Sequence, residues 1–186
     1  MPMPDSWDET ALININDGST DMSLHAITET IDISMGDKPM EGIPTLAGGR
    51  VRKRSPQEDT EITFEGYPIG IGDKDATSQD GLDLFFNAGT ASTAPFSATS
   101  STSRNTFEVT IMWTDGTSTS ATSSVPSGKY ALRYQFRNCD MTSCKPSFTD
   151  GILKATYTFK CVPFTKTGVA NITVQSTDGT ASMATI

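Results

Sequence analysis

The chain has 186 residues, which is enough for one well-filled core. Its formal net charge of −8 argues against a protein that binds nucleic-acid phosphates. No apolar run reaches the roughly 20 residues that a membrane helix needs, and the first residues are too acidic for a secretory signal. Serine and threonine make up roughly a quarter of the chain, a balance that favours β structure. We therefore expect one all-β domain over residues 1–186, with residues 1–10 as a loose lead-in.

The first strands are predicted at Ala11–Ile15, Met22–Ser34 and Asp59–Tyr67. In the second of these, the isoleucines at positions 27, 31 and 33 alternate with polar side chains. In the third, Ile62 and Phe64 alternate with glutamate and threonine. This period of two is typical of a strand with one buried and one solvated side.

A long connection, residues 35–58, joins Met22–Ser34 to Asp59–Tyr67, and we call it the arm. Its sequence, MGDKPMEGIPTLAGGRVRKRSPQE, is rich in glycine and proline and has no apolar stripe. Hairpin loops use about two to five residues, so a connection of this length indicates a function of its own. The basic run in it is closely followed by acids, which suits head-to-tail contacts between identical copies, although charge runs are usually solvated surface. The predicted subunit interface consists of Arg50, Arg52, Lys53, Arg54, Glu58 and Asp59.

The second half of the chain continues the β pattern. Residues 73–87 are the best helix candidate, with Leu82–Phe86 as a strand in the alternative interpretation. Further strands are predicted at Thr106–Thr114, Tyr130–Asn138 and Ile152–Val162, with an exposed return strand at Thr117–Val125, a turn region at Asp140–Phe148, and closing strands at Gly168–Gln175 and Ala181–Ile186. In Tyr130–Asn138 the aromatic positions are expected inward and Arg133 outward.

No residue pattern predicts catalysis, a cofactor or a metal site. The one histidine, His25, stands in a strand without a triad motif nearby, and no phosphate-binding glycine loop occurs. Glu61 and Glu65 share a strand face, as solvated strands commonly allow, and lack the aromatic residues that bind sugars. The three cysteines form an odd set; unpaired thiols are favoured, with a Cys139–Cys144 bridge as the alternative.

In the order and residue composition of these segments, the chain resembles the tail tube proteins (major tail proteins) of tailed bacterial or archaeal viruses. The segments that carry the resemblance are ITETIDISMGDKPMEGIPTLAGGRV, DTEITFEGYPIGIG, the helix candidate, YALRYQFRN and ILKATYTFKCVPF. The resemblance implies an all-β fold, a β-sandwich or barrel of the viral tail-tube type with one short flanking helix and a long inter-strand arm. It also implies hexameric rings that stack into a tube for genome delivery.

On this resemblance, the polar sides of the two amphipathic strands would face the lumen of the tube. The residues concerned are Thr28, Thr30, Asp32, Glu61, Thr63 and Glu65. The arm would reach a neighbouring subunit or ring, or face the lumen. The implied partners are the protein itself, other tail proteins such as the tape measure, terminator or baseplate, and viral DNA that passes without specific binding; no membrane insertion is implied. The implied location is the virion tail, assembled in the host cytoplasm.

A second interpretation is a secreted or cell-surface β-sandwich binding module, such as an adhesin or a carbohydrate-binding domain. Serine- and threonine-rich loops suit that class of protein. The acidic N-terminal sequence argues against it, because it does not look like a secretory signal.

Overall fold

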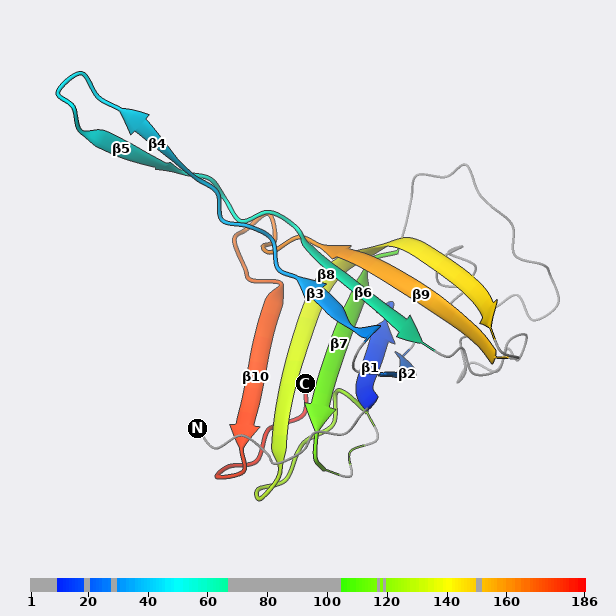
Figure 1. The fold of residues 1–186 in the computed structure, drawn as a ribbon. Helices are drawn as coiled ribbons and strands as arrows, with labels where there is room; N and C mark the ends of the chain where they lie inside the picture. The colour runs from blue at the N-terminus through cyan, green and yellow to red at the C-terminus, as the bar shows by residue number, and fades with distance from the viewer. Residues whose placement is uncertain are drawn as a thin grey trace.

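The computed structural model describes residues 10–18, 21–27, 30–66, 105–116, 118, 120–149 and 152–186, which form strands joined by turns (Figure 1). The first strands are β1 (Thr10–Asn16), β2 (Asp21–Ile27), β3 (Asp32–Ser34), β4 (Met40–Pro44), β5 (Arg50–Arg54) and β6 (Thr60–Gly66). The later strands are β7 (Phe107–Thr114), β8 (Tyr130–Thr149), β9 (Ile152–Cys161) and β10 (Ile172–Asp178). The described ranges contain no α-helix. The helix predicted at residues 73–87 and the lead-in at residues 1–9 lie outside them.

Eight strands form one curled sheet in the order β10-β8-β7-β1-β2-β6-β3, and β9 pairs with both β6 and β8. The pairings therefore run from β1 through β2, β6, β9, β8 and β7 back to β1, closed at one point by Ala26 opposite Gly66. The arm forms a separate two-stranded sheet from β4 and β5. The predicted all-β class is confirmed.

Strand β8 is 20 residues long and changes partner along its length. Its first half pairs with β10, and from Cys139 onward it pairs with β9. At the change, Asn138 has a φ of 54°, and its side-chain amide donates to Asn171 Oδ1 at 2.8 Å. The turn predicted at Asp140–Phe148 is therefore wrong. The apolar side of β9 offers this segment a partner, and the segment continues as a strand.

The inner side of the curled sheet holds the main core. Phe64 of β6 lies 5.5 Å from Tyr157 and 6.0 Å from Phe159, measured between ring centroids. The fully buried members around these rings come from β1, β6, β7, β8 and β9: Ile13, Ile15, Ile62, Val109, Ile111 and Phe136. Each such side chain contributes about 1.5–3 kcal/mol by leaving water. The alternation in β6, β7 and β9 predicted this face correctly.

A smaller apolar cluster covers the outer side of β1, β7 and the first half of β8. Its members are Leu12, Met112, Ala121, Val125, Ala131 and Met183. Among the described residues of 117–125 and 181–186, turns and one backbone bridge between Val125 and Met183 replace the two strands predicted there. These segments are too irregular to pair as strands, but they bury the outer face of the sheet.

Arg133 lies on this outer side of β8, as its place in the alternation predicted, but it is fully buried there rather than solvated. Its guanidinium donates to the Ala184 carbonyl at 2.8 Å and to Gln175 Oε1 at 3.1 Å, and also to the Ser123 carbonyl. Burial lowers the pKa of Arg133. The ordinary pKa of arginine lies so far above neutral pH that the side chain stays charged. The prediction failed because the C-terminal segment covers a position that alternation alone marks as solvated.

The predicted strand Met22–Ser34 is two strands, β2 and β3. Both pair with the same edge of β6, through Ala26 opposite Gly66 and Ile33 opposite Ile62. Between them, the Thr30 hydroxyl lies 3.3 Å from the Glu65 amide nitrogen and 3.4 Å from its carbonyl oxygen. A side chain that bonds to the backbone of β6 competes with a regular ladder and separates the two strands.

The strand predicted at Gly168–Gln175 begins later than expected, because a turn precedes it. The Gly168 amide donates to the Thr165 carbonyl at 2.9 Å, and Gly168 has a φ of 83°. Strand β10 starts only at Ile172 and continues to Asp178.

A disulfide joins Cys139 to Cys161, which are directly opposite each other on β8 and β9. Cys144 is half-buried and is not part of the bridge. Both predictions for Cys139, an unpaired thiol or a bridge to Cys144, are therefore wrong. Strand register, which brings together residues 22 positions apart, decides the pairing rather than the short spacing.

Replacing Arg133 by alanine should lower the free energy of unfolding by about 3 kcal/mol, because it opens a cavity and leaves buried carbonyls without donors. Urea titration followed by tryptophan fluorescence measures the loss. The control is Arg137→Ala, which removes a half-exposed arginine that is paired with Glu108 and should cost less than about 1 kcal/mol. Equal losses in the two variants would contradict a special role for Arg133.

Candidate assembly surfaces

The outer side of β3, β6, β9 and the second half of β8 forms a continuous polar surface, which we call the polar wall. Cross-strand pairs point to the same side of a sheet, so its members follow from the register. They are Asp32, Ser34, Glu61, Thr63, Glu65, Asp140, Ser143, Lys145, Ser147, Lys154, Thr156, Thr158 and Lys160. All of them are exposed or half-buried. The wall is thus the solvated reverse of the sheet that holds Phe64, Tyr157 and Phe159.

Opposite charges are paired across the polar wall. Lys154 Nζ lies 2.9 Å from Glu65 Oε1, and Lys160 Nζ lies 3.6 Å from Glu61 Oε2. Thr63 and Thr158 share a hydrogen bond of 3.3 Å between their hydroxyls. Such half-exposed pairs contribute little to stability. Their main effect is to leave a hydroxylated surface on which the acids and the lysines nearly cancel.

Four of the six residues predicted to face a lumen lie together on this wall: Asp32, Glu61, Thr63 and Glu65. Thr30 lies beside them and uses its hydroxyl on the Glu65 backbone. Thr28 lies outside the described residues. No local pattern indicated that the lysines of β9 are neighbours of these acids, because the β6–β9 pairing joins segments far apart in the chain.

The arm is a β-hairpin whose strand residues are all exposed, and it projects away from the sheet (Figure 1). The sequence did not predict strands here, because neither side of the hairpin is buried and no apolar alternation results. At the tip, the Gly48 amide donates to the Thr45 carbonyl at 3.0 Å, and Gly48 has a φ of 78°. The residue order TLAGG was the available signal for this turn.

The two sides of the arm differ in chemistry. Register places Met40, Gly42 and Pro44 opposite Arg54, Arg52 and Arg50, so the three arginines share one side. The other side holds the Ile43–Val51 pair and the Glu41–Lys53 pair. Of the predicted interface bases, Lys53 therefore points away from the three arginines.

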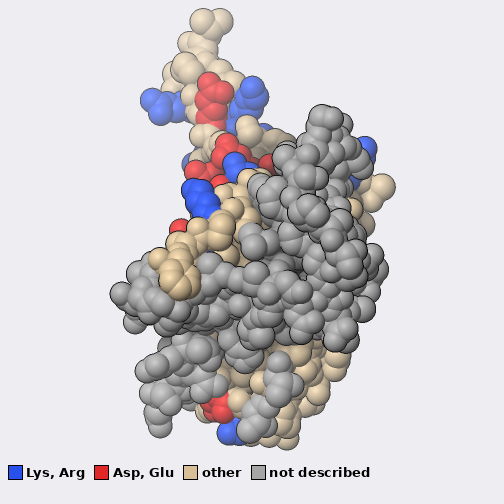
Figure 2. Space-filling model, turned by 90° about the vertical axis from the view of Figure 1, so that its right-hand side faces the viewer, with Lys and Arg blue, Asp and Glu red and all other residues tan. Residues whose placement is uncertain are grey.

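The root of the arm is acidic and tightly joined. Asp37, Glu58 and Asp59 are exposed there, and Figure 2 shows acidic side chains gathered where the arm leaves the body. The Glu58 amide donates to the Asp37 carbonyl at 2.9 Å. Only glycine fits at position 36, because a Cβ there would come within 2.0 Å of the Glu58 carbonyl oxygen. The acids of the predicted subunit interface, Glu58 and Asp59, are therefore at the root of the arm, whereas its bases lie along β5.

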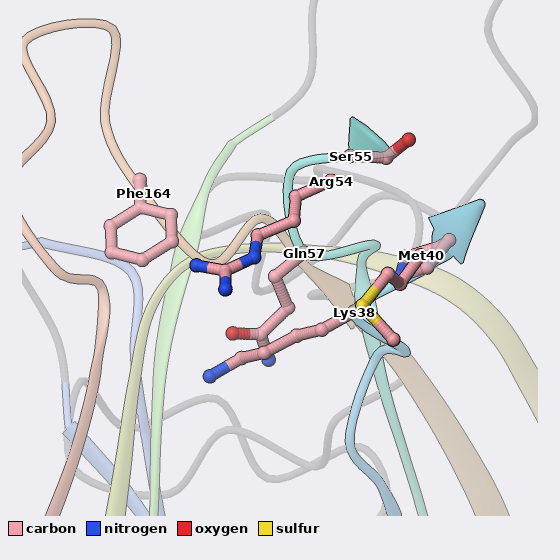
Figure 3. A pocket seen from close by; sticks show the side chains of 7 residues that line it. Lys38, Met40, Arg54, Ser55, Gln57 and Phe164 are labelled. Carbon is pink, nitrogen blue, oxygen red and sulfur yellow. The ribbon is translucent and has the colours of Figure 1, made fainter. Parts of the chain in front are cut away.

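A hollow of about 370 Å³ lies between the root of the arm and the loop after β9. It is lined by Lys38, Pro39, Met40, Arg54, Ser55, Gln57 and Phe164. In Figure 3 the Arg54 guanidinium points toward the Phe164 ring, and Lys38 and Gln57 extend into the same space. Cations above an apolar floor suit an acidic group from outside.

Nothing in the described residues points to metal chemistry or to a membrane helix. No group of three or more His, Cys, Asp and Glu side chains is placed to hold a metal ion there. In the same residues, no helix is long and apolar enough to cross a membrane.

No protein-family model matches the chain, and no curated protein matches it. Among solved structures, it is similar to a chain of the PVC sheath–tube complex, an extracellular contractile injection system, with a TM-score of 0.57 and 13% identity over 95% of this chain and 93% of that one. The sheath/tube terminator of PVC gives a TM-score of 0.53 and 13% identity over 94% and 97%. A chain of the anti-feeding prophage baseplate gives a TM-score of 0.57 and 10% identity over 94% of this chain and 97% of that one. The chain therefore has the fold of subunits found in contractile injection systems, and the predicted tube-type fold is confirmed.

Replacing Gly36 by alanine should open the root of the arm, because the new Cβ overlaps the Glu58 backbone. The Glu58 amide should then lose its acceptor and exchange its hydrogen at least about tenfold faster, as measured by NMR-detected hydrogen exchange. Gly42→Ala is the matched control, since a Cβ there meets only the Arg50 side chain, at 3.7 Å. Unchanged exchange at Glu58 in the Gly36 variant would show that the root is not held by this contact.

Proposed function

We propose that this protein is the structural subunit of a tail tube, which assembles into hexameric rings that stack and deliver the genome of a tailed virus. The observation that carries the proposal is the division of the sheet into a packed inner side and a polar wall, with an arm whose two strands are exposed along their whole length. The fold shared with chains of contractile injection systems supports it. The role is structural rather than catalytic.

In the proposed tube, the polar wall faces the lumen, with Asp32, Glu61, Thr63 and Glu65 on it and Thr30 beside it. Thr28, outside the described residues, stays a predicted lumen residue. Proteins hold DNA by lysines and arginines that neutralise its phosphates. Here Lys154 and Lys160 are already paired with Glu65 and Glu61, so they are less available to phosphate. A surface of hydroxyls and paired charges would let DNA slide through without binding specifically.

The arm would join the subunits. Its arginine side would meet the acids at the root of another copy's arm, so that Arg50, Arg52 and Arg54 face Glu58 and Asp59. Bases and acids occupy different parts of one arm, so the contact is head-to-tail, the kind that closes into rings or continues as a stack. Complementary charge also speeds and orients the encounter.

The ends of such a tube would contact other tail proteins, such as a tape measure, a terminator or a baseplate. The particle would be a virion tail, assembled in the host cytoplasm. The tube of an injection particle is the second candidate, favoured by the systems in which the fold occurs. The two candidates differ in the cargo of the tube and agree on its architecture.

Negative-stain microscopy of the concentrated, purified chain should show rings with a central hole and stacked tubes. Tubes isolated from producing cells would then be tested for enclosed DNA by nuclease protection. Protected genome-length DNA supports the viral tail, and tubes that enclose protein support the injection particle. A chain that stays monomeric at high concentration and binds glycans on an array would instead favour the secreted binding module.

Reversing two arm charges, by Arg52→Glu with Arg54→Glu, should weaken assembly and leave the fold intact, because both side chains are exposed. We expect a rise of about tenfold or more in the concentration needed for tubes at low salt. Sedimentation measures assembly, and circular dichroism checks the fold. Lys166→Glu, in an exposed turn on the body, is the control and should assemble normally. Tubes of unchanged yield from the double variant would remove the arginines from the interface.

A further inference from the structure

The side of the arm opposite the three arginines carries apolar residues that the charge-based contact does not use, besides the Glu41–Lys53 pair nearer the root. Ile43 and Val51 form a cross-strand pair on the side opposite the three arginines, and both are exposed. Leu46, at the tip, is fully exposed. A two-stranded hairpin is at best marginally stable alone in water, and contiguous exposed apolar side chains commonly mark a binding surface. This side of the arm therefore needs a partner surface.

The same chain has an apolar groove of about 270 Å³ in its body, between the segment around β3 and strands β7 and β8. Ile31, Ile33 and Met35 lie on one side of it, and Trp113, Leu132 and Tyr134 on the other. None of the six is fully buried, although Ile31, Ile33, Trp113 and Tyr134 pack against the core. Val174 of β10 is opposite Tyr134 in register and is also exposed. The main core thus extends outward as an apolar strip that the described residues leave uncovered.

A subunit cannot fill this groove with its own arm tip. Met35, at the start of the arm, lines the groove, whereas Leu46 lies at the far end of a hairpin that projects away from the sheet (Figure 1). An apolar projection and an apolar groove on one chain, kept apart by its geometry, make a heterologous contact between copies. The two surfaces also match in character toward the tip of the arm, since the Glu41–Lys53 pair lies nearer its root than the Ile43–Val51 pair, and none of the groove residues is charged.

We propose that the groove formed by Ile31, Ile33, Met35, Trp113, Leu132 and Tyr134 receives the tip and apolar side of the arm of a neighbouring copy. The proposal rests on the tube function and names the receiving surface of the arm. The arm docks with Leu46, Ile43 and Val51 against the groove, and its arginine side remains available for the acids at an arm root.

The test is a photocrosslink in assembled full-length protein. Leu46 is replaced by p-benzoylphenylalanine, and this chain is mixed with ¹⁵N-labelled wild-type chain, assembled, irradiated and digested with trypsin. Trypsin does not cleave between Lys38 and Pro39, so the probe lies in the peptide 1–50. We expect this peptide to be joined to a labelled peptide from the groove, above all 105–129, which contains Trp113. The same probe at Lys166 is the control and should not label that peptide. Arm crosslinks that map elsewhere in intact tubes would overturn the proposal.

A matched pair of substitutions provides a second measurement. Val51→Lys should raise the concentration needed for assembly about tenfold, because it puts a charge on the docking side. Val169→Lys changes a valine of similar exposure, 60% against 57% for Val51, and should have no effect. Equal behaviour of the two variants would overturn the proposal. If the wild-type chain forms no rings or tubes at all, the tube function itself fails, and microscopy of the same sample distinguishes that outcome.

Discussion

Strand β8 pairs with β10 along its first half and with β9 along its second half, and the curl of the sheet depends on this change of partner. A strand that kept one neighbour throughout would continue a flat, open sheet. At Asn138 the backbone takes a positive φ, and the side chain is held by Asn171. The inner residues on both sides of this point, Phe136 and Met141, still belong to one core. The bend therefore closes the sheet without dividing its interior.

The bend also gives the molecule two outer surfaces of different chemistry. Over the first half of β8, the chain covers its own sheet with its C-terminal segment, held by the hydrogen bonds of Arg133. Over the second half and across β9, β6 and β3, the described residues provide no cover, and the strands carry threonine, serine and paired charges. A sheet face that is hydroxylated and charge-balanced is stable in contact with water. This is the property that the inner surface of a tube requires.

Alternation in the sequence predicted β6, β7 and β9, and with them most of the core. It failed where burial depends on distant parts of the chain. Arg133 is covered by a segment some fifty residues away, and residues 140–148 extend β8 because β9 is there to pair with them. It also failed for the arm, where both sides of β4 and β5 are exposed and no period of two can arise. Glu61 and Glu65 of the polar wall were found from β6 alone, whereas their lysine partners required the β6–β9 register.

The two sides of the arm would contribute differently to assembly. Apolar contact gives affinity that hardly depends on salt, but it does little to fix orientation. Charge pairs between exposed side chains add little affinity, yet they reject wrong alignments, and their range falls to about 10 Å at 0.1 M salt. An arm with only Ile43, Val51 and Leu46 would bind apolar surfaces indiscriminately, and one with only its arginines would release its partner as salt rises. Alternation along β4 and β5 separates the two functions onto opposite sides of one hairpin, so a single element can supply both the affinity and the register of a subunit contact.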